Sequence, residues 1–364
     1  MRSVSASIFL IVSVLIAIGV VMIYSAGALH GYEKMQDSLY FIKRHLVYVA
    51  VGYAAMFTIM LMNVSTLRIF SKWMIAISGL LLLGVLVPGL GREISGARRW
   101  FSFGPITFQP SELAKIAIII YIADLVARRE AALRSFMYGY LPPLVITGAC
   151  VGLVLLEPDL GTAIDIAAIS FLMLFVSGAR VSHIIFTALA SLPFLYVLLF
   201  SVPYRRKRLL IFLNPWADRK GTGFQIIQSL IALGSGGLIG VGLGQSKQKL
   251  FYLPEAHTDF IFAIIGEELG FLGALAIIAL FALFIWQGMR VCLNSQDAFG
   301  RALSFGVVTM IALEAIINIG VVCGILPTKG LPLPFVSYGG TSLVFHMMAV
   351  GLLLNIAKRC EVSR

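Results

Sequence analysis

Residues 3–32 read SVSASIFLIVSVLIAIGVVMIYSAGALHGY, and this stretch decides the class of fold. No charged side chain occurs between Arg2 and Glu33, and Ile, Val, Leu and Ala dominate the interval. A helix needs about 20 mainly apolar residues to cross the hydrocarbon of a bilayer. The stretch is too long for the apolar part of a removed signal peptide and lacks a small-residue cleavage site, so it predicts a membrane-spanning helix.

Similar intervals recur along the chain. Five more are free of charge, and four others tolerate internal charge: 45–67, 73–91, 135–156, 181–204 and 269–289, followed by 111–127, 160–179, 302–323 and 341–357. Ten crossings keep Arg2 and the basic tail on one side, which the positive-inside rule makes the cytoplasm. We therefore predict an all-α polytopic integral membrane protein with ten transmembrane helices, cytoplasmic N and C termini, and a single domain over residues 1–364.

Composition agrees with a membrane location. Of the 364 residues, 59% are hydrophobic and 12% are charged, about half the charge of a soluble domain. This excludes a soluble globular protein. The four cysteines lie in apolar runs or short connections, so we expect reduced thiols rather than a disulfide scaffold. The net charge of +11 indicates anionic partners such as lipid head groups or a phosphorylated substrate, and not nucleic acid.

Residues 204–258 form a large predicted extracytoplasmic loop between the seventh and eighth helices. It carries eight basic residues, either as a surface that faces lipid head groups or as a cationic funnel for a phosphorylated ligand. Within it, residues 221–246 are uncharged but rich in glycine, which weakens helices. We expect an interfacial or re-entrant segment there, with glycines that let backbones approach closely.

Ionisable residues inside predicted spans are functional candidates, because burying charge in a bilayer is costly. Lys115 lies three residues after Glu112 on the same helical face. Asp159 enters from the same side and is expected to pair with Lys115, either as a brace between helices or in a polar cavity that contacts substrate. Asp165 lies deeper and is harder to interpret. Glu314 and Asn318 are interpreted as helix-to-helix hydrogen-bonding groups.

The run 247–260, KQKLFYLPEAHTDF, concentrates titratable groups at the mouth of the next apolar helix. Glu255, His257 and Asp259 could bind a metal, or they could supply a general base with its orienting groups. Spacing alone leaves both readings open. Neither a Ser-His-Asp elbow nor a zinc-binding motif occurs in the chain, so hydrolase and zinc-enzyme functions have no support.

Six strings, taken together, resemble the shape, elongation, division and sporulation family of bacterial cell-wall glycosyltransferases. In chain order they are GARRW (96–100), QPSELAK (109–115), EPDLGT (157–162), NPW with GFQIIQS (214–229), PEAHTDFIF (254–262) and LPTKGLPLPFVSYGG (326–340). The last string is more similar to the division branch than to the elongation or sporulation branches.

The resemblance implies a polymerase of lipid II, the undecaprenyl diphosphate-linked disaccharide pentapeptide, at the outer face of the bacterial cytoplasmic membrane. It makes Asp259 the essential acid, and our hypothesis is that Asp259 acts as general base in a single inverting displacement. The departing diphosphate needs cations, from basic side chains such as Arg99 and Lys249 or from a divalent ion, Mg²⁺ or Mn²⁺. We expect no organic cofactor and assign no metal ligand.

The resemblance also implies substrate-binding residues and partners. The substrate-binding set is Arg99, Trp100, Glu112, Lys115, Asp159, Asn214, Gln225, Ser229, Lys249, His257 and Ser337. The implied partners are a class B penicillin-binding protein transpeptidase and other division proteins. Two other functions compete with polymerisation: a lipid II flippase and a non-catalytic scaffold. Titratable groups concentrated at one mouth favour the polymerase, because a flippase needs polar groups through the full membrane depth.

Overall fold

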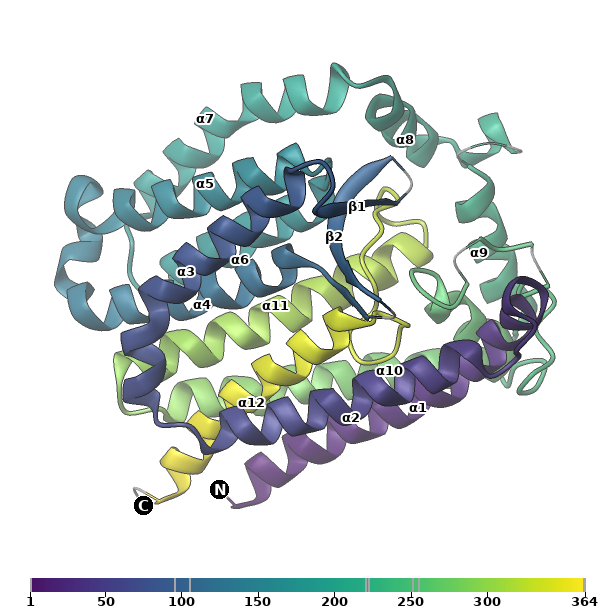
Figure 1. Cartoon of the computed structure of the whole chain (residues 1–364), viewed down its shortest axis with the longest axis horizontal. Helices are drawn as coiled ribbons and strands as arrows, with labels where there is room; N and C mark the ends of the chain where they lie inside the picture. The colour runs from purple at the N-terminus through teal and green to yellow at the C-terminus, as the bar shows by residue number, and fades with distance from the viewer. Residues whose placement is uncertain are drawn as a thin grey trace.

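The computed structural model describes residues 2–94, 96–104, 106–219, 221, 223–250, 252–254 and 256–362. Most of the chain is helical (Figure 1). The helices before the large loop are α1 (Arg2–Met35), α2 (Tyr40–Leu61), α3 (Val64–Leu86), α4 (Pro110–Arg129), η1 (Glu130–Arg134), η2 (Phe136–Tyr140), α5 (Leu141–Leu156), α6 (Leu160–Val176) and α7 (Val181–Phe200). After them come α8 (Pro203–Leu213), η3 (Pro215–Asp218), α9 (Phe224–Ser235), α10 (Ile261–Asn294), α11 (Ala298–Val322) and α12 (Thr341–Val362).

Helices occur at all ten positions predicted to cross a membrane. Within the described residues, eight helical segments are long and apolar enough to do so: α1, α2, α3, η2 with α5, α7, α10, α11 and α12. The other two, α4 and α6, are more polar or shorter, yet most residues of α4 are buried against neighbouring helices. The chain is therefore a multi-pass membrane protein.

The polar elements gather at one end of the bundle. The start of α1 and the end of α12 meet at the opposite end, at the lower left of Figure 1, where the Ser5 hydroxyl donates to Glu361 at 2.9 Å, while the strands, α8 and α9 lie toward the right. At the edge of the bundle α7 has no buried residue, and its large apolar side chains, such as Phe186 and Leu189, face outward. This exposure suits contact with lipid tails.

A small antiparallel sheet corrects the prediction of a purely helical fold. Its strands, in order, are β1 (Gly91–Ile94), β2 (Ala97–Phe103) and β3 (Ile106–Phe108). Arg92 pairs with Trp100, and Phe101 pairs with Phe108. The strands are too short to be recognised among charged residues by hydropathy, and antiparallel pairing depends on partners across the sheet rather than on one segment.

The glycine-rich segment after α9 docks into a break in α10. Gly270 has φ of +68°, which interrupts the helix and leaves backbone groups to be satisfied elsewhere. Val241 and Gly242 donate their N–H groups to the carbonyls of Glu267 and Glu268, while Phe271 donates to Gly237. A Cβ at Gly236 would lie 1.9 Å from the Gly266 carbonyl oxygen, so the backbones touch. The expected close approach of glycine backbones is confirmed.

Candidate functional site

Asp259 lies in a turn immediately before α10, and the backbone around it is held at three successive carbonyls. The His257 carbonyl accepts from the N–H of Tyr338 at 3.0 Å, and the Thr258 carbonyl accepts from the Ser337 hydroxyl at 2.6 Å. The Asp259 carbonyl accepts from the side-chain amide of Asn318 on α11 at 2.8 Å. The HTDF turn is thus fixed by α11 and by the loop 323–340.

The Asp259 side chain is half-buried and reaches the same loop. A Cβ built on Gly330 would lie 3.0 Å from its Oδ2, so the absence of a side chain at Gly330 leaves room for the carboxylate. The neighbouring Lys329 is half-buried, and burial lowers the pKa of its ammonium, an effect that the charge of Asp165 opposes. The mouth therefore combines a carboxylate with a partly buried lysine.

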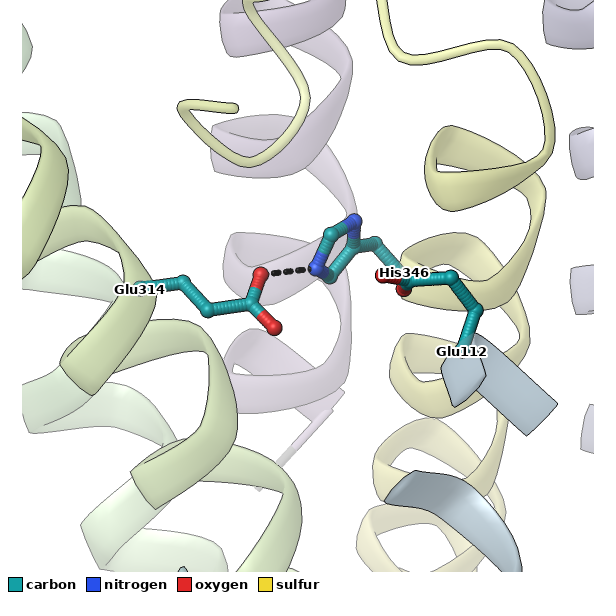
Figure 2. Close-up of side chains that lie close together, drawn as sticks. All are labelled: Glu112, Glu314 and His346. Carbon is teal, nitrogen blue, oxygen red and sulfur yellow. Dashed lines mark hydrogen bonds and ion pairs between the residues drawn. The ribbon is translucent and has the colours of Figure 1, made fainter. Parts of the chain in front are cut away.

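Beneath this turn lies a buried ionic cluster built from four helices. Lys115 on α4 forms ion pairs with Glu314 on α11 and, at 3.0 Å, with Glu112 one turn earlier on its own helix. Asp165 on α6 lies 4.0 Å from the Lys115 ammonium. His346 on α12 contacts the other oxygen of Glu314 (Figure 2). All five side chains are at least 94% buried.

Asp159 does not join this cluster, which corrects the predicted pair with Lys115. Its carboxylate caps the start of α6 by accepting from the N–H and hydroxyl of Thr162, and it lies 3.8 Å from the Arg99 guanidinium of β2. The same guanidinium donates to the carbonyls of Glu157 and Pro158. The sheet therefore clamps the α5–α6 turn, and Lys115 finds its partners on α4, α6 and α11 instead.

Glu157 in this turn is fully buried, and neither carboxylate oxygen has a hydrogen-bond partner among the described residues. Burial, aided by the nearby charge of Asp159, raises the pKa of the Glu157 carboxyl to about 8, while Arg99 opposes the shift. At neutral pH the carboxyl is therefore mainly protonated.

The basic segment of the large loop forms α8, next to the 323–340 loop. Arg208 donates to the Thr328 carbonyl at 3.3 Å, and Lys207 pairs with Asp218 at 2.9 Å. Lys249 instead binds Glu268 and the Ser25 hydroxyl, at 2.9 and 3.0 Å, and so fastens its loop to α10 and α1. Four of the loop's basic residues thus lie on α8, while Lys249 is held in a structural ion pair.

The remaining residues named from the sequence occupy different settings. Ser229 is buried and donates to the Val322 carbonyl, while the His257 ring lies against Phe41 and Tyr338. Asn214 is exposed at the end of α8, and Gln225 is half-buried in the first turn of α9. Trp100 is half-buried on β2. Glu255 lies outside the described residues. Contact of any of these with substrate stays a prediction.

From the sequence alone, His346 is not singled out, and Glu314 is interpreted only as a hydrogen-bonding group between helices. Both are ionisable residues within apolar helices, and this is the signal that could have singled them out. Glu112, Glu314 and His346 each offer a ligand atom, and these atoms lie within 4.8 Å of one another. This trio could hold a metal ion.

Fold and site together define a multi-pass membrane protein whose ionisable side chains concentrate at the mouth and upper core of a helical bundle. The model of the "Cell cycle protein" family, which covers FtsW, RodA and SpoVE, matches residues 5–361. The chain belongs to this family.

Named relatives and solved structures agree with this membership. The chain is 46% identical to the probable peptidoglycan glycosyltransferase FtsW of Geobacter metallireducens, over 97% of this chain and 94% of the relative. It is 45% identical to the stage V sporulation protein E of Bacillus subtilis, over 96% and 95%. A chain from the structure titled "Structural coordination of polymerization and crosslinking by a peptidoglycan synthase complex" matches with a TM-score of 0.80 and 32% identity, over 97% of both chains. The rod shape determining protein RodA of Thermus thermophilus matches with a TM-score of 0.70 and 28% identity, over 96% and 95%.

Proposed function

We propose that this protein is a peptidoglycan glycosyltransferase that polymerises lipid II into glycan strands at the outer face of the cytoplasmic membrane. The observation that carries the proposal is the three-point anchoring of the HTDF turn, which presents the Asp259 carboxylate at the mouth of the bundle. The names of its relatives, which include several FtsW proteins, support the same activity.

In the proposed reaction Asp259 is the general base. It accepts the proton of the acceptor sugar's 4-hydroxyl as that oxygen attacks the anomeric carbon of the donor. The bond from this carbon to the diphosphate oxygen breaks, so the configuration inverts in one step and the lipid diphosphate leaves. A positioned base contributes roughly 10²- to 10⁴-fold in rate.

Negative charge on the departing diphosphate requires nearby cations. Arg208 supports this role, because its guanidinium reaches the loop that also carries Lys329 and Gly330. Arg99 lies beside the α5–α6 turn and is a second candidate, while Lys249 is already paired with Glu268. A divalent ion such as Mg²⁺ or Mn²⁺, carried in with the diphosphate, is part of the proposal.

For the membrane arrangement we propose ten crossings in one domain over residues 1–364. The polar helices α4 and α6 join the eight apolar segments, both termini are cytoplasmic, and residues 204–258 lie outside. The contact between the start of α1 and the end of α12 supports an even number of crossings. Reporter fusions test the topology. A reporter fused within residues 204–258 should be found outside the cytoplasmic membrane, and a reporter fused at the C terminus should be found in the cytoplasm. The opposite result would reverse the orientation.

The activity is tested with purified full-length protein and lipid II in detergent. The wild type should produce glycan polymer, and Asp259→Asn should lose at least about 100-fold in rate. Asp37→Asn, which removes an acid from the exposed α1–α2 loop, is the matched control and should leave the rate unchanged. Normal polymerisation by Asp259→Asn contradicts the assignment of the base. Absence of polymer from the wild type, combined with lipid II transfer across vesicles, would favour a flippase.

A class B penicillin-binding protein is the partner we propose, because glycan strands must be crosslinked after polymerisation. The similar solved chain comes from a complex whose title couples polymerization to crosslinking. Adding the cognate transpeptidase should increase the polymerisation rate. We prefer a role in cell division, with other division proteins as further partners. Depletion of the protein should then give filamentous cells. A block only in spore formation would instead support the sporulation role.

A further inference from the structure

With the His346 imidazole neutral, as a metal ligand must be, the buried cluster around Lys115 carries more negative than positive charge. Glu112, Asp165 and Glu314 supply three carboxylates, against the ammonium group of Lys115 and that of Lys329 acting on Asp165 from the loop above. Each of the three acids is at most 5% exposed. Uncompensated charge is strongly unfavourable in such a place, so the cluster is suited to take up a further cation.

Three of the side chains converge in the way that a metal ion requires. Glu112 reaches in from α4, Glu314 from α11 and His346 from α12, with their ligand atoms within 4.8 Å of one another (Figure 2). Two carboxylates and one imidazole form a mixed oxygen and nitrogen donor set, which suits Mn²⁺ and related divalent transition ions better than Ca²⁺.

Asp165 provides the second observation. It is fully buried, and no hydrogen bond reaches either of its carboxylate oxygens among the described residues, although the Lys115 ammonium lies 4.0 Å away. A cation bound by the two glutamates would repel Lys115, and Asp165 offers the displaced ammonium a carboxylate that accepts no hydrogen bond among the described residues. Lys115 can therefore leave the two glutamates without losing a carboxylate partner, because Asp165 already lies 4.0 Å from its ammonium.

We propose that Glu112, Glu314 and His346 bind one divalent transition-metal ion of the Mn²⁺ type, with Lys115 turning toward Asp165 when the ion binds. The site lies in the helix core and is separate from any ion that arrives with a diphosphate. Asn318, one turn after Glu314 on α11, holds the Asp259 carbonyl. The bound ion ties α4, α11 and α12 together directly below the proposed base.

The test is Mn²⁺ binding to the purified full-length protein in detergent, followed by electron paramagnetic resonance without substrate. The wild type should bind one ion, and its pulsed spectrum should show hyperfine coupling to a histidine nitrogen. His346→Gln should lower the affinity at least ~10-fold. His45→Gln is the matched control, since His45 is also fully buried on a helix, and it should bind as the wild type does.

Asp259→Asn should also bind Mn²⁺ normally, which separates this site from the proposed catalytic activity. Absence of a bound ion in the wild type, absence of nitrogen coupling, or unchanged affinity in folded His346→Gln would each overturn the proposal. Because the nitrogen coupling is measured on the wild type, the result does not depend on whether a variant folds.

Discussion

The side-chain amide of Asn318 donates to the backbone carbonyl of Asp259 across 2.8 Å, although 59 residues separate the two along the chain. The same amide also donates to the Leu331 carbonyl at 2.7 Å. One side chain on α11 thereby joins the turn that carries the proposed base to the loop that borders it. The position of Asp259 depends on this contact.

Asn318→Ala should therefore reduce polymerisation in the folded protein by about tenfold or more. Each carbonyl left without its donor costs about 1–3 kcal/mol, and the turn is free to shift. Asn355→Ala is the matched control, because Asn355 donates to the carbonyls of Ile59, Met60 and Met62 at the other end of the bundle. Both variants should melt earlier, but only Asn318→Ala should lose turnover per folded molecule. Equal turnover would show that the contact does not position the base.

Gly330→Ala should impair catalysis with little effect on stability. The new Cβ would lie 3.0 Å from Asp259 Oδ2, so the carboxylate must move by a few tenths of an ångström. A displaced catalytic group can lose up to about 100-fold in rate. Gly148→Ala, which meets no atom within 4 Å, serves as control in the same polymerisation assay. A wild-type rate for Gly330→Ala would mean that Asp259 has more freedom than the structure indicates.

Gly236→Ala and Gly234→Ala form a matched pair for the docking of the glycine-rich segment. The first places a Cβ 1.9 Å from the Gly266 carbonyl oxygen and must push the segment out of the α10 break, which costs about 1–3 kcal/mol or more. The second meets nothing within 4 Å in helix α9 and should stabilise by up to about 1 kcal/mol. Thermal unfolding in detergent measures both. Similar melting temperatures for the two variants would exclude the docked arrangement.

Glu157 gives the protein a pH-dependent stability. Its carboxyl has a pKa of about 8 in the folded state against 4.5 ordinarily, so between these values the folded protein holds a proton that the unfolded chain has released. Stability should therefore fall as the pH rises from about 4.5 to 8. Glu157→Gln keeps the side chain neutral and should flatten this dependence, with a stabilisation over the wild type that grows with pH and levels off above about pH 8. Melting temperatures measured from pH 5 to 9 check this. The control Glu93→Gln, at an exposed position, should keep the wild-type slope of melting temperature against pH. The same slope in Glu157→Gln would assign the pH dependence to other groups.

Local sequence was sufficient wherever the physics is local. Apolar runs of sufficient length predicted the helix positions, because transfer of apolar side chains into lipid depends on each segment alone. The i, i+3 spacing placed Glu112 and Lys115 on the same helical face, and in the structure they form an ion pair at 3.0 Å. Glycine content predicted close backbone approach in 221–246, and the HTDF string identified Asp259 as the candidate base, which stays a prediction.

Tertiary structure alone decided which partners the buried charges find on other helices. Lys115 was predicted to pair with Asp159, yet the packing of α4 against α6 and α11 brings Asp165 and Glu314 to it and leaves Asp159 to Arg99 on the sheet. His346 enters the cluster from α12, and its contact with Glu314 spans 32 positions of the chain, so no local motif could have named it. A buried ion takes whichever counter-charge the packed helices bring within a few ångströms, and that distance is set by the fold rather than by spacing in the sequence.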